Sequence, residues 1–264
     1  SEAQSFALIT DSSTHLKMAC GDKKAAFKIC LLDPELTLSQ PHMVTAATGI
    51  DAISHALESY VSIKKNTISQ TFARQAWGML FENLPKVLQS PLDINARGAM
   101  QLGAHFAGVS IENSMLGICH SCANPLTAHY GIPHGIAIGI LLPHVLRFNS
   151  NHVGNCYQTL VRDIGRSTNS LADSGDILAD IITSFLALAG IPKNLHDCGV
   201  FLDRLSQLMQ PGDLFLFTTL SVIGIDIQAL WNHSNSISLQ HLNFFNPKSI
   251  RILIDRFGLE VLEV

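Results

Sequence analysis

The segment GIDAISHALESY, residues 49–60, decides both the fold and the chemistry predicted for this chain. Its apolar residues recur with the spacing of one side of an α-helix. Two ionisable residues, Asp51 and His55, stand four positions apart within that apolar pattern, so a helix places them on one face, one turn apart. Burying a charge costs several kcal/mol, roughly, unless it is paired. We therefore expect Asp51 and His55 either to pair with each other or to share a cation.

Helical periodicity extends from about residue 36 onward, whereas the first 35 residues have a different pattern. Those residues contain two short apolar runs with β character, SFALIT (5–10) and FKICLLD (27–33), separated by a polar stretch. A short helix is expected just after His120. Longer helices are predicted at residues 45–62, 67–89, 94–116, 133–149, 175–190 and 246–258. The sequence thus predicts a mainly α fold of at least six helices, with β structure mainly confined to the first 35 residues.

Composition excludes several classes of function. Hydrophobic residues make up 47% of the 264 residues and charged residues 14%, which is ample material for a large core. The net charge of −4 argues against nucleic-acid binding, which requires clustered Lys and Arg. No apolar run reaches the roughly 18 residues of a membrane span, and the N-terminus has no signal-peptide pattern. We therefore expect a cytoplasmic protein that binds neither nucleic acid nor membranes.

The only close cysteine pair, Cys119 and Cys122, forms a C-x-x-C pattern within CHSC. A zinc ribbon would need a second such pair, and a thioredoxin-like site would follow a strand in a βαβ unit. Neither context is present in the sequence. The pattern therefore favours small residues that allow close helix packing.

The chain has twelve histidines, and the segment GICHSCANPLTAHYGIPHGIAIGILLPHVLRFN, residues 117–149, contains His120, His129, His134 and His144. Taken one at a time, each histidine favours a structural role, and Asp51 with His55 could equally form a buried hydrogen-bonded couple. Imidazole and carboxylate groups are nevertheless the ligands that first-row divalent metals accept. The combination of the two segments therefore carries more weight than any single residue.

The two segments together, residues 33–62 and 117–149, closely resemble the iron-containing (group III) alcohol dehydrogenases. In that family a G-x-D-x-x-x-H-A-x-E motif supplies an Asp and a His to the metal. Two further histidine ligands lie fourteen residues apart, the second of them in a P-H-G motif. The resemblance implies the family's helical C-terminal domain, a dehydroquinate-synthase-like fold. It also implies four metal ligands, at Asp51, His55, His120 and His134.

The resemblance further implies an oxidoreductase that interconverts an alcohol and an aldehyde or ketone, with Fe²⁺ (or Zn²⁺) and a nicotinamide cofactor. Lys17 matches a lysine that approaches the dinucleotide in relatives, although an exposed loop lysine is the simpler interpretation. Residues 1–35 resemble the end of the cofactor domain, and residues 36–264 the metal-binding domain. The chain has no G-x-G-x-x-G and no G-G-G-S turn, so we expect NAD or NADP to bind weakly unless the rest of that domain is supplied.

Several positions depart from the family pattern and keep a second hypothesis open. Asn124 stands where the family commonly has a histidine, and Ile138 where it has an asparagine. Because asparagine cannot titrate, it cannot serve as a base. The alternative is therefore a non-catalytic metal-binding or oligomer-forming module. Chemistry like that of glycerol dehydrogenase or dehydroquinate synthase, and assembly into a homo-oligomer, also stay open. Gly131, Gly135 and Gly139, four residues apart, are interpreted as a close-packing helix face.

Overall fold

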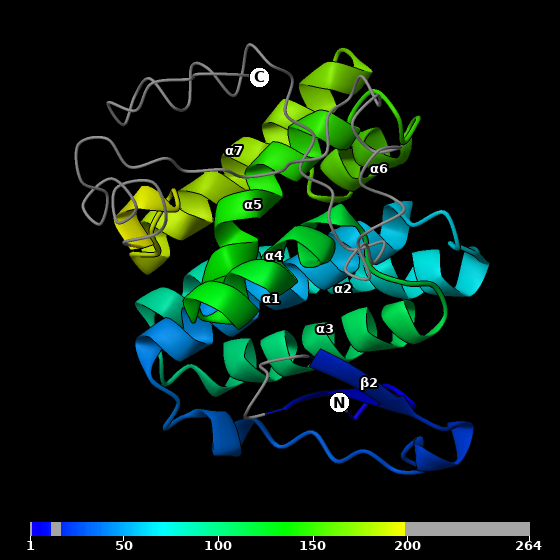
Figure 1. Cartoon of the computed structure of the whole chain (residues 1–264). Coiled ribbons are helices and arrows are strands. Elements are labelled where there is room, and N and C mark those ends of the chain that lie inside the picture. Colours follow the sequence, from blue (N-terminus) through cyan, green and yellow to red (C-terminus); the bar gives the residue numbers. More distant parts are fainter. Residues whose placement is uncertain (1, 12–16, 199–264) are drawn as a thin grey trace, which may run out of the picture. The chain divides into compact units, whose positions relative to one another are not determined.

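The computed structural model describes residues 2–11 and 17–198 (Figure 1). This part of the chain is mainly helical, as predicted, and its α-helices are α1 (His42–Val61), α2 (Thr67–Gln89), α3 (Ile94–Glu112), α4 (Ile118–Tyr130), α5 (His134–Asn149), α6 (Cys156–Asp163) and α7 (Leu171–Ala189). None of these helices is long and apolar enough to cross a membrane. The helix predicted at residues 246–258 lies outside the described residues.

Helix α1 is the centre of the helical packing. Ala46, Ile50, Ile53 and Leu57 are almost wholly buried, and their spacing forms the apolar stripe that the sequence predicts. On one part of its surface α1 contacts α2 and α3, which also pack against each other. Elsewhere α1 contacts α5, which packs against α4 and α7 (Figure 1). The residues of the opening segment are therefore held from several directions.

Local capping residues set where several helices begin and end. The Asn66 side-chain oxygen caps α2 by accepting from the backbone N–H of Ser69. The Ser69 hydroxyl accepts in turn from the backbone N–H of Asn66, which completes a capping box. Helix α4 ends at Gly131, whose φ of 66° lies in the left-handed region. Only Ile132 and Pro133 then separate Gly131 from α5, so the two helices fold back on each other. The start of α5 then packs directly on α1, since a Cβ at Gly135 would lie 2.2 Å from the Ala47 carbonyl oxygen.

The only sheet in the described residues is a hairpin, and it corrects one sequence prediction. Strand β1 (Phe6–Thr10) was predicted, but it pairs antiparallel with β2 (Lys17–Gly21), which falls in the polar stretch. The predicted strand at residues 27–33 is not formed. A strand needs a partner for its backbone groups, and the nearer segment pairs at a lower cost of loop closure. Side-chain composition alone could not identify that partner.

The hairpin lies beside α3 (Figure 1). Glu112, the last residue of α3, accepts hydrogen bonds from the Ser5 amide at 3.0 Å and the Ser5 hydroxyl at 2.6 Å. Three apolar side chains of the 27–33 segment remain exposed, with fractions of 66%, 79% and 89% for Phe27, Ile29 and Leu31. The division of the chain at residue 35 stays a prediction.

Helix boundaries differ from the predictions at several places, including the start of α1 at His42 (predicted at 45) and the end of α3 at Glu112 (predicted at 116). Helix α6 was missed because it has only eight residues, too few for a clear periodicity. Helix α4 already includes His120, which the sequence analysis placed before a short helix. Helix α7 begins at Leu171 and not at residue 175, because the Ser170 side chain caps it by accepting from the Asp173 amide.

Candidate metal centre

Three helices carry the four predicted ligand residues. Asp51 and His55 lie one turn apart in the middle of α1, His120 is the third residue of α4, and His134 is the first residue of α5. His120 is nearly buried at 7% exposed, whereas the other three side chains are 23–28% exposed. The structure therefore brings these residues together in a cluster that is partly exposed to solvent.

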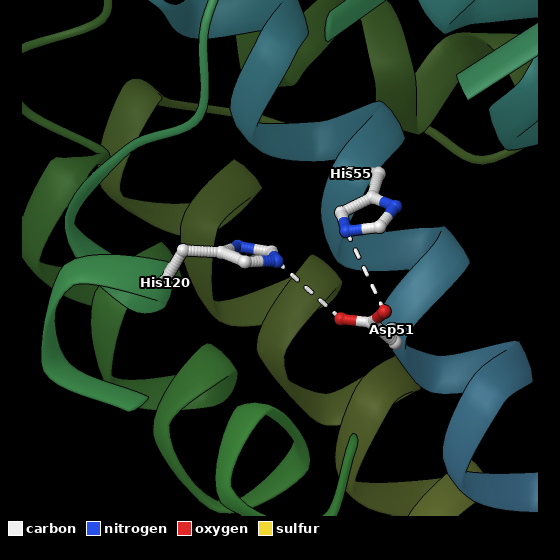
Figure 2. Close-up of side chains that lie close together, drawn as sticks. All are labelled: Asp51, His55 and His120. Atoms are coloured by element: carbon white, nitrogen blue, oxygen red, sulfur yellow. Dashed lines mark ion pairs between the residues drawn. The ribbon is translucent and has the colours of Figure 1, made fainter. Parts of the chain in front are cut away.

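The Asp51 carboxylate is the centre of this cluster. Its Oδ2 lies 3.5 Å from His55 Nε2, and its Oδ1 lies 3.4 Å from His120 Nε2 (Figure 2). His134 Nε2 lies 3.7 Å from the same Oδ1. One donor atom from each of Asp51, His55 and His120 falls within 4.8 Å of the others. All three imidazoles therefore turn their Nε2 atoms toward one carboxylate.

These separations are too long for hydrogen bonds, which favour about 2.7–3.2 Å. Asp51 Oδ1 and His120 Nε2 are buried, and neither makes a hydrogen bond. Around a tetrahedral ion at about 2.1 Å from each ligand, neighbouring donor atoms lie about 3.4 Å apart. The carboxylate–imidazole distances of 3.4–3.7 Å are thus compatible with ligands of a shared cation, although the donor atoms of Asp51, His55 and His120 lie up to 4.8 Å apart.

The charges in the cluster perturb the pKa values of its members. Burial acts to raise the pKa of Asp51, but the neighbouring imidazoles, His55 foremost, outweigh it and lower the value to about 2. Burial also acts to lower the pKa of His120, yet contacts with Asp51 and Glu58 raise it to about 9. For His55, burial dominates over the attraction of Asp51 and lowers the pKa. Asp51 is therefore a carboxylate at neutral pH, and His55 is neutral.

Glu58 is a fifth member of the site that the sequence analysis did not assign. It is 3% exposed, and its Oε2 lies 2.6 Å from His120 Nδ1. Its Oε1 accepts a hydrogen bond from the Cys119 amide at 2.7 Å. The signal was present in the sequence, because Glu58 follows Asp51 and His55 at the helical spacing of seven and three residues.

Other residues singled out in the sequence have different positions. Lys17 is the first residue of β2 and pairs with Thr10 through the backbone; its side chain lies outside what the structure describes. Asn124 lies on α4 one turn after His120 and is half-buried. Burial raises the pKa of the Cys119 thiol well above its usual value, and its Sγ donates to the Ile138 carbonyl. The C-x-x-C pattern thus agrees with a packing role.

The glycines of the 131–139 segment divide into two kinds. A Cβ at Gly135 would lie 2.2 Å from the Ala47 carbonyl oxygen, and one at Gly139 would lie 2.7 Å from a Leu186 methyl. These two glycines do form a close-packing face, and Gly135 lies directly after His134. Gly131 was wrongly included in that face, because it ends α4 in the left-handed region and no atom would meet its Cβ within 4 Å.

Comparison with known proteins agrees with the family resemblance of the sequence. The family model for the C-terminal part of the Fe-containing alcohol dehydrogenase family matches residues 45–212. The chain belongs to this family. An NAD-dependent methanol dehydrogenase of Bacillus methanolicus is 34% identical over 202 residues, covering 76% of this chain and 53% of the relative. An NADPH-dependent butanol dehydrogenase of Clostridium saccharobutylicum is 33% identical, covering 75% and 51%.

Solved structures of iron-containing alcohol dehydrogenase relatives share the fold. An alcohol dehydrogenase from Oenococcus oeni has a TM-score of 0.72 at 29% identity. The matched region covers 78% of this chain and 55% of that dehydrogenase. A 1,3-propanediol oxidoreductase has a TM-score of 0.73 at 26% identity, covering 97% and 62%. The chain therefore spans about half the length of the curated relatives it matches.

Proposed function

We propose that the candidate centre holds one divalent metal ion, Fe²⁺ or Zn²⁺, through four side chains: Asp51, His55, His120 and His134. The chain would then form the metal-binding half of a nicotinamide-dependent alcohol dehydrogenase. The observation that carries this proposal is the spacing of 3.4–3.7 Å between three imidazole nitrogens and one carboxylate. Two buried polar atoms of the cluster without a hydrogen bond support it, since such atoms are costly unless something satisfies them.

The donor set suits this chemistry. Three neutral imidazoles and one carboxylate are compatible with Fe²⁺, Zn²⁺ and similar ions. Such an ion would supply Lewis-acid polarisation of the substrate oxygen. Asp51 would offset part of the ionic charge, and the histidines would fix its position. The partial exposure of Asp51, His55 and His134 leaves an approach for a small molecule, as a catalytic site requires.

The relatives indicate the substrate class. Their names specify methanol, butanol and 1,3-propanediol, and both NAD and NADPH. We therefore propose a small alcohol or its aldehyde as the substrate, with either nicotinamide cofactor. Hydride transfer requires that cofactor. We expect this chain alone to bind it weakly, because no glycine-rich pyrophosphate turn is present in its sequence.

Metal titration together with a turnover assay tests this proposal. Metal-free protein should bind one Zn²⁺, or one Fe²⁺ without oxygen, and His134→Ala should weaken that binding. His144→Ala is the matched control, because His144 lies exposed on the same helix. Loaded protein is then assayed with small alcohols and NAD or NADP, and with aldehydes and the reduced cofactors. Failure to bind metal, or equal effects of the two variants, would refute the metal centre.

A non-catalytic metal-binding module is the second candidate, and Asn124 favours it. This residue lies one turn from His120 on α4 and cannot titrate. Tight metal binding without turnover, even when the chain is fused to the cofactor domain of a relative, would favour this module. Turnover by that fusion would favour the dehydrogenase.

A further inference from the structure

Glu58 is a buried carboxylate whose two oxygens face two different donors. Oε1 accepts from the Cys119 amide in the first turn of α4, and Oε2 lies 2.6 Å from His120 Nδ1. The side chain is 3% exposed, so water cannot replace either partner. A buried charge persists only where such partners compensate it, and the positive end of the α4 dipole adds to them.

The position of α4 depends on this carboxylate. Gly117 precedes α4, and a Cβ there would lie 2.8 Å from Glu58 Oε1. A side chain at this position would therefore force the carboxylate to shift away from the helix start. Because His120 follows within the same turn, the contact that anchors the helix also fixes the backbone from which the imidazole extends.

The same carboxylate determines which ring nitrogen of His120 faces the cluster. A carboxylate accepts hydrogen bonds, so Nδ1 must carry the proton that points at Oε2. The ring is then held with Nε2 directed at Asp51, 3.4 Å from Oδ1. In the metal-loaded protein this arrangement leaves the Nε2 lone pair free to bind the ion. Carboxylate–histidine pairs of this kind are a general means of orienting metal ligands.

We propose that Glu58 is the positioning residue of the metal centre, which holds the His120 ring in the orientation and tautomer that metal binding requires. This inference rests on the proposed metal site. It goes beyond that site by assigning a function to a residue that does not touch the metal. The alternative is that Glu58 only caps α4. In that case, loss of its contact with His120 would not change the metal affinity.

Glu58→Gln separates these two roles. Glutamine keeps the size of the side chain, but only its oxygen accepts hydrogen bonds. If that oxygen stays on the Cys119 amide, the NH2 group faces His120 Nδ1 and can only donate, which favours the tautomer protonated at Nε2. We expect Zn²⁺ affinity to fall about 10–100-fold, measured by competition with a chromogenic chelator. Glu112→Gln is the control, because Glu112 also accepts from a backbone amide and a second donor, but at the N-terminal hairpin. Its affinity should match that of the wild type.

A double-mutant cycle tests whether Glu58 acts through His120. In a His120→Ala background, Glu58→Gln should change Zn²⁺ affinity by less than about twofold, because the contact is already lost. In the Zn²⁺-loaded wild type, ¹H–¹⁵N NMR should show a downfield His120 Nδ1 proton, which disappears or shifts in Glu58→Gln. Circular dichroism checks the fold of each variant. If Glu58→Gln did not fold, Gly117→Ala would carry the test, because its Cβ displaces the carboxylate without removing it.

The failures of the two proposals are distinguishable. Normal Zn²⁺ binding by the wild type together with unchanged affinity in Glu58→Gln would overturn the positioning role alone. An equal loss with and without the His120 ring would also overturn it. Absence of Zn²⁺ binding by the wild type would overturn the metal centre, and the positioning role with it.

Discussion

Replacing Gly135 with alanine tests how tightly the packing of α5 on α1 controls the site. The new Cβ would lie 2.2 Å from the Ala47 carbonyl oxygen, where ordinary contacts begin at 3.4 Å. The neighbour is backbone and cannot rotate away, so the start of α5 must retreat by about 1.2 Å, the difference between these two distances. His134 is the adjacent residue and must move with it. Metal–nitrogen bonds of about 2.0–2.1 Å do not tolerate such a displacement.

We expect Gly135→Ala to cost about 1–3 kcal/mol of unfolding free energy through overpacking. We also expect it to lower Zn²⁺ affinity by a factor of ten or more, on the order of the loss caused by disturbing a ligand's support. Urea denaturation of the metal-free protein and chelator competition measure the two effects. Gly78→Ala is the matched control, since Gly78 is also helical but a Cβ there meets nothing within 4 Å. Gly78→Ala should raise the free energy of unfolding by roughly 0.5–1 kcal/mol, because alanine has the higher helix propensity, and should leave the metal affinity unchanged.

Equal behaviour of the two alanine variants would refute this reasoning. It would mean that α5 does not approach α1 as closely as the structure shows, and that the position of His134 is set elsewhere. A loss of stability in Gly135→Ala with unchanged metal affinity would refute the second part only. The packing would then be real, but His134 would not depend on it.

Three further predictions concern protons, the core and the surface. His120 has a pKa of about 9 in the metal-free protein and must lose its proton to bind a metal, so binding at pH 7 should release about one proton. The metal affinity should then rise about tenfold per pH unit toward pH 9. Calorimetry in buffers of different ionisation enthalpy measures the proton release, and finding none would contradict this prediction. Trp77 is wholly buried, and its Nε1 donates to the Leu160 carbonyl at 2.9 Å. Trp77→Phe should therefore lower the unfolding free energy, measured by urea denaturation, by about 1–3 kcal/mol and leave the Zn²⁺ affinity unchanged. A lower affinity would contradict a purely structural role. The Arg74–Asp163 pair is partly exposed, so Arg74→Gln should cost at most about 1 kcal/mol, and a larger loss would show that solvent screens the pair less than we infer.

The helical body was predictable because its signals are local. The apolar stripe of α1 follows the 3.6-residue period, and Gly190 ends α7 in the left-handed conformation that a glycine at a helix end predicts. Strand β2 was not predictable, since it contains Lys17 and Gly21 and forms through pairing with β1. Its existence depends on a non-local backbone partner, about which the side chains of the segment say little.

The candidate site was predictable only in part. The spacing of Asp51 and His55 predicted a shared helix face, which α1 provides. That His120 and His134 join them depends on how α4 and α5 pack against α1, and the sequence indicated it only through a family resemblance. Glu58 occupies the glutamate position of the G-x-D-x-x-x-H-A-x-E motif, but the sequence analysis gave it no role. Its partners come from another helix, and only the three-dimensional arrangement shows them.

Anomalous diffraction from crystals of the Zn²⁺-loaded protein, recorded on both sides of the zinc absorption edge, tests the central claim most directly. The account predicts one strong zinc peak. Asp51, His55, His120 and His134 should each supply a ligand atom about 2.0–2.2 Å from the ion. His120 should bind through Nε2, with Nδ1 still facing Glu58. A peak bound by other residues, or ordered zinc elsewhere with none at this cluster, would contradict the claim that these four side chains form a metal centre.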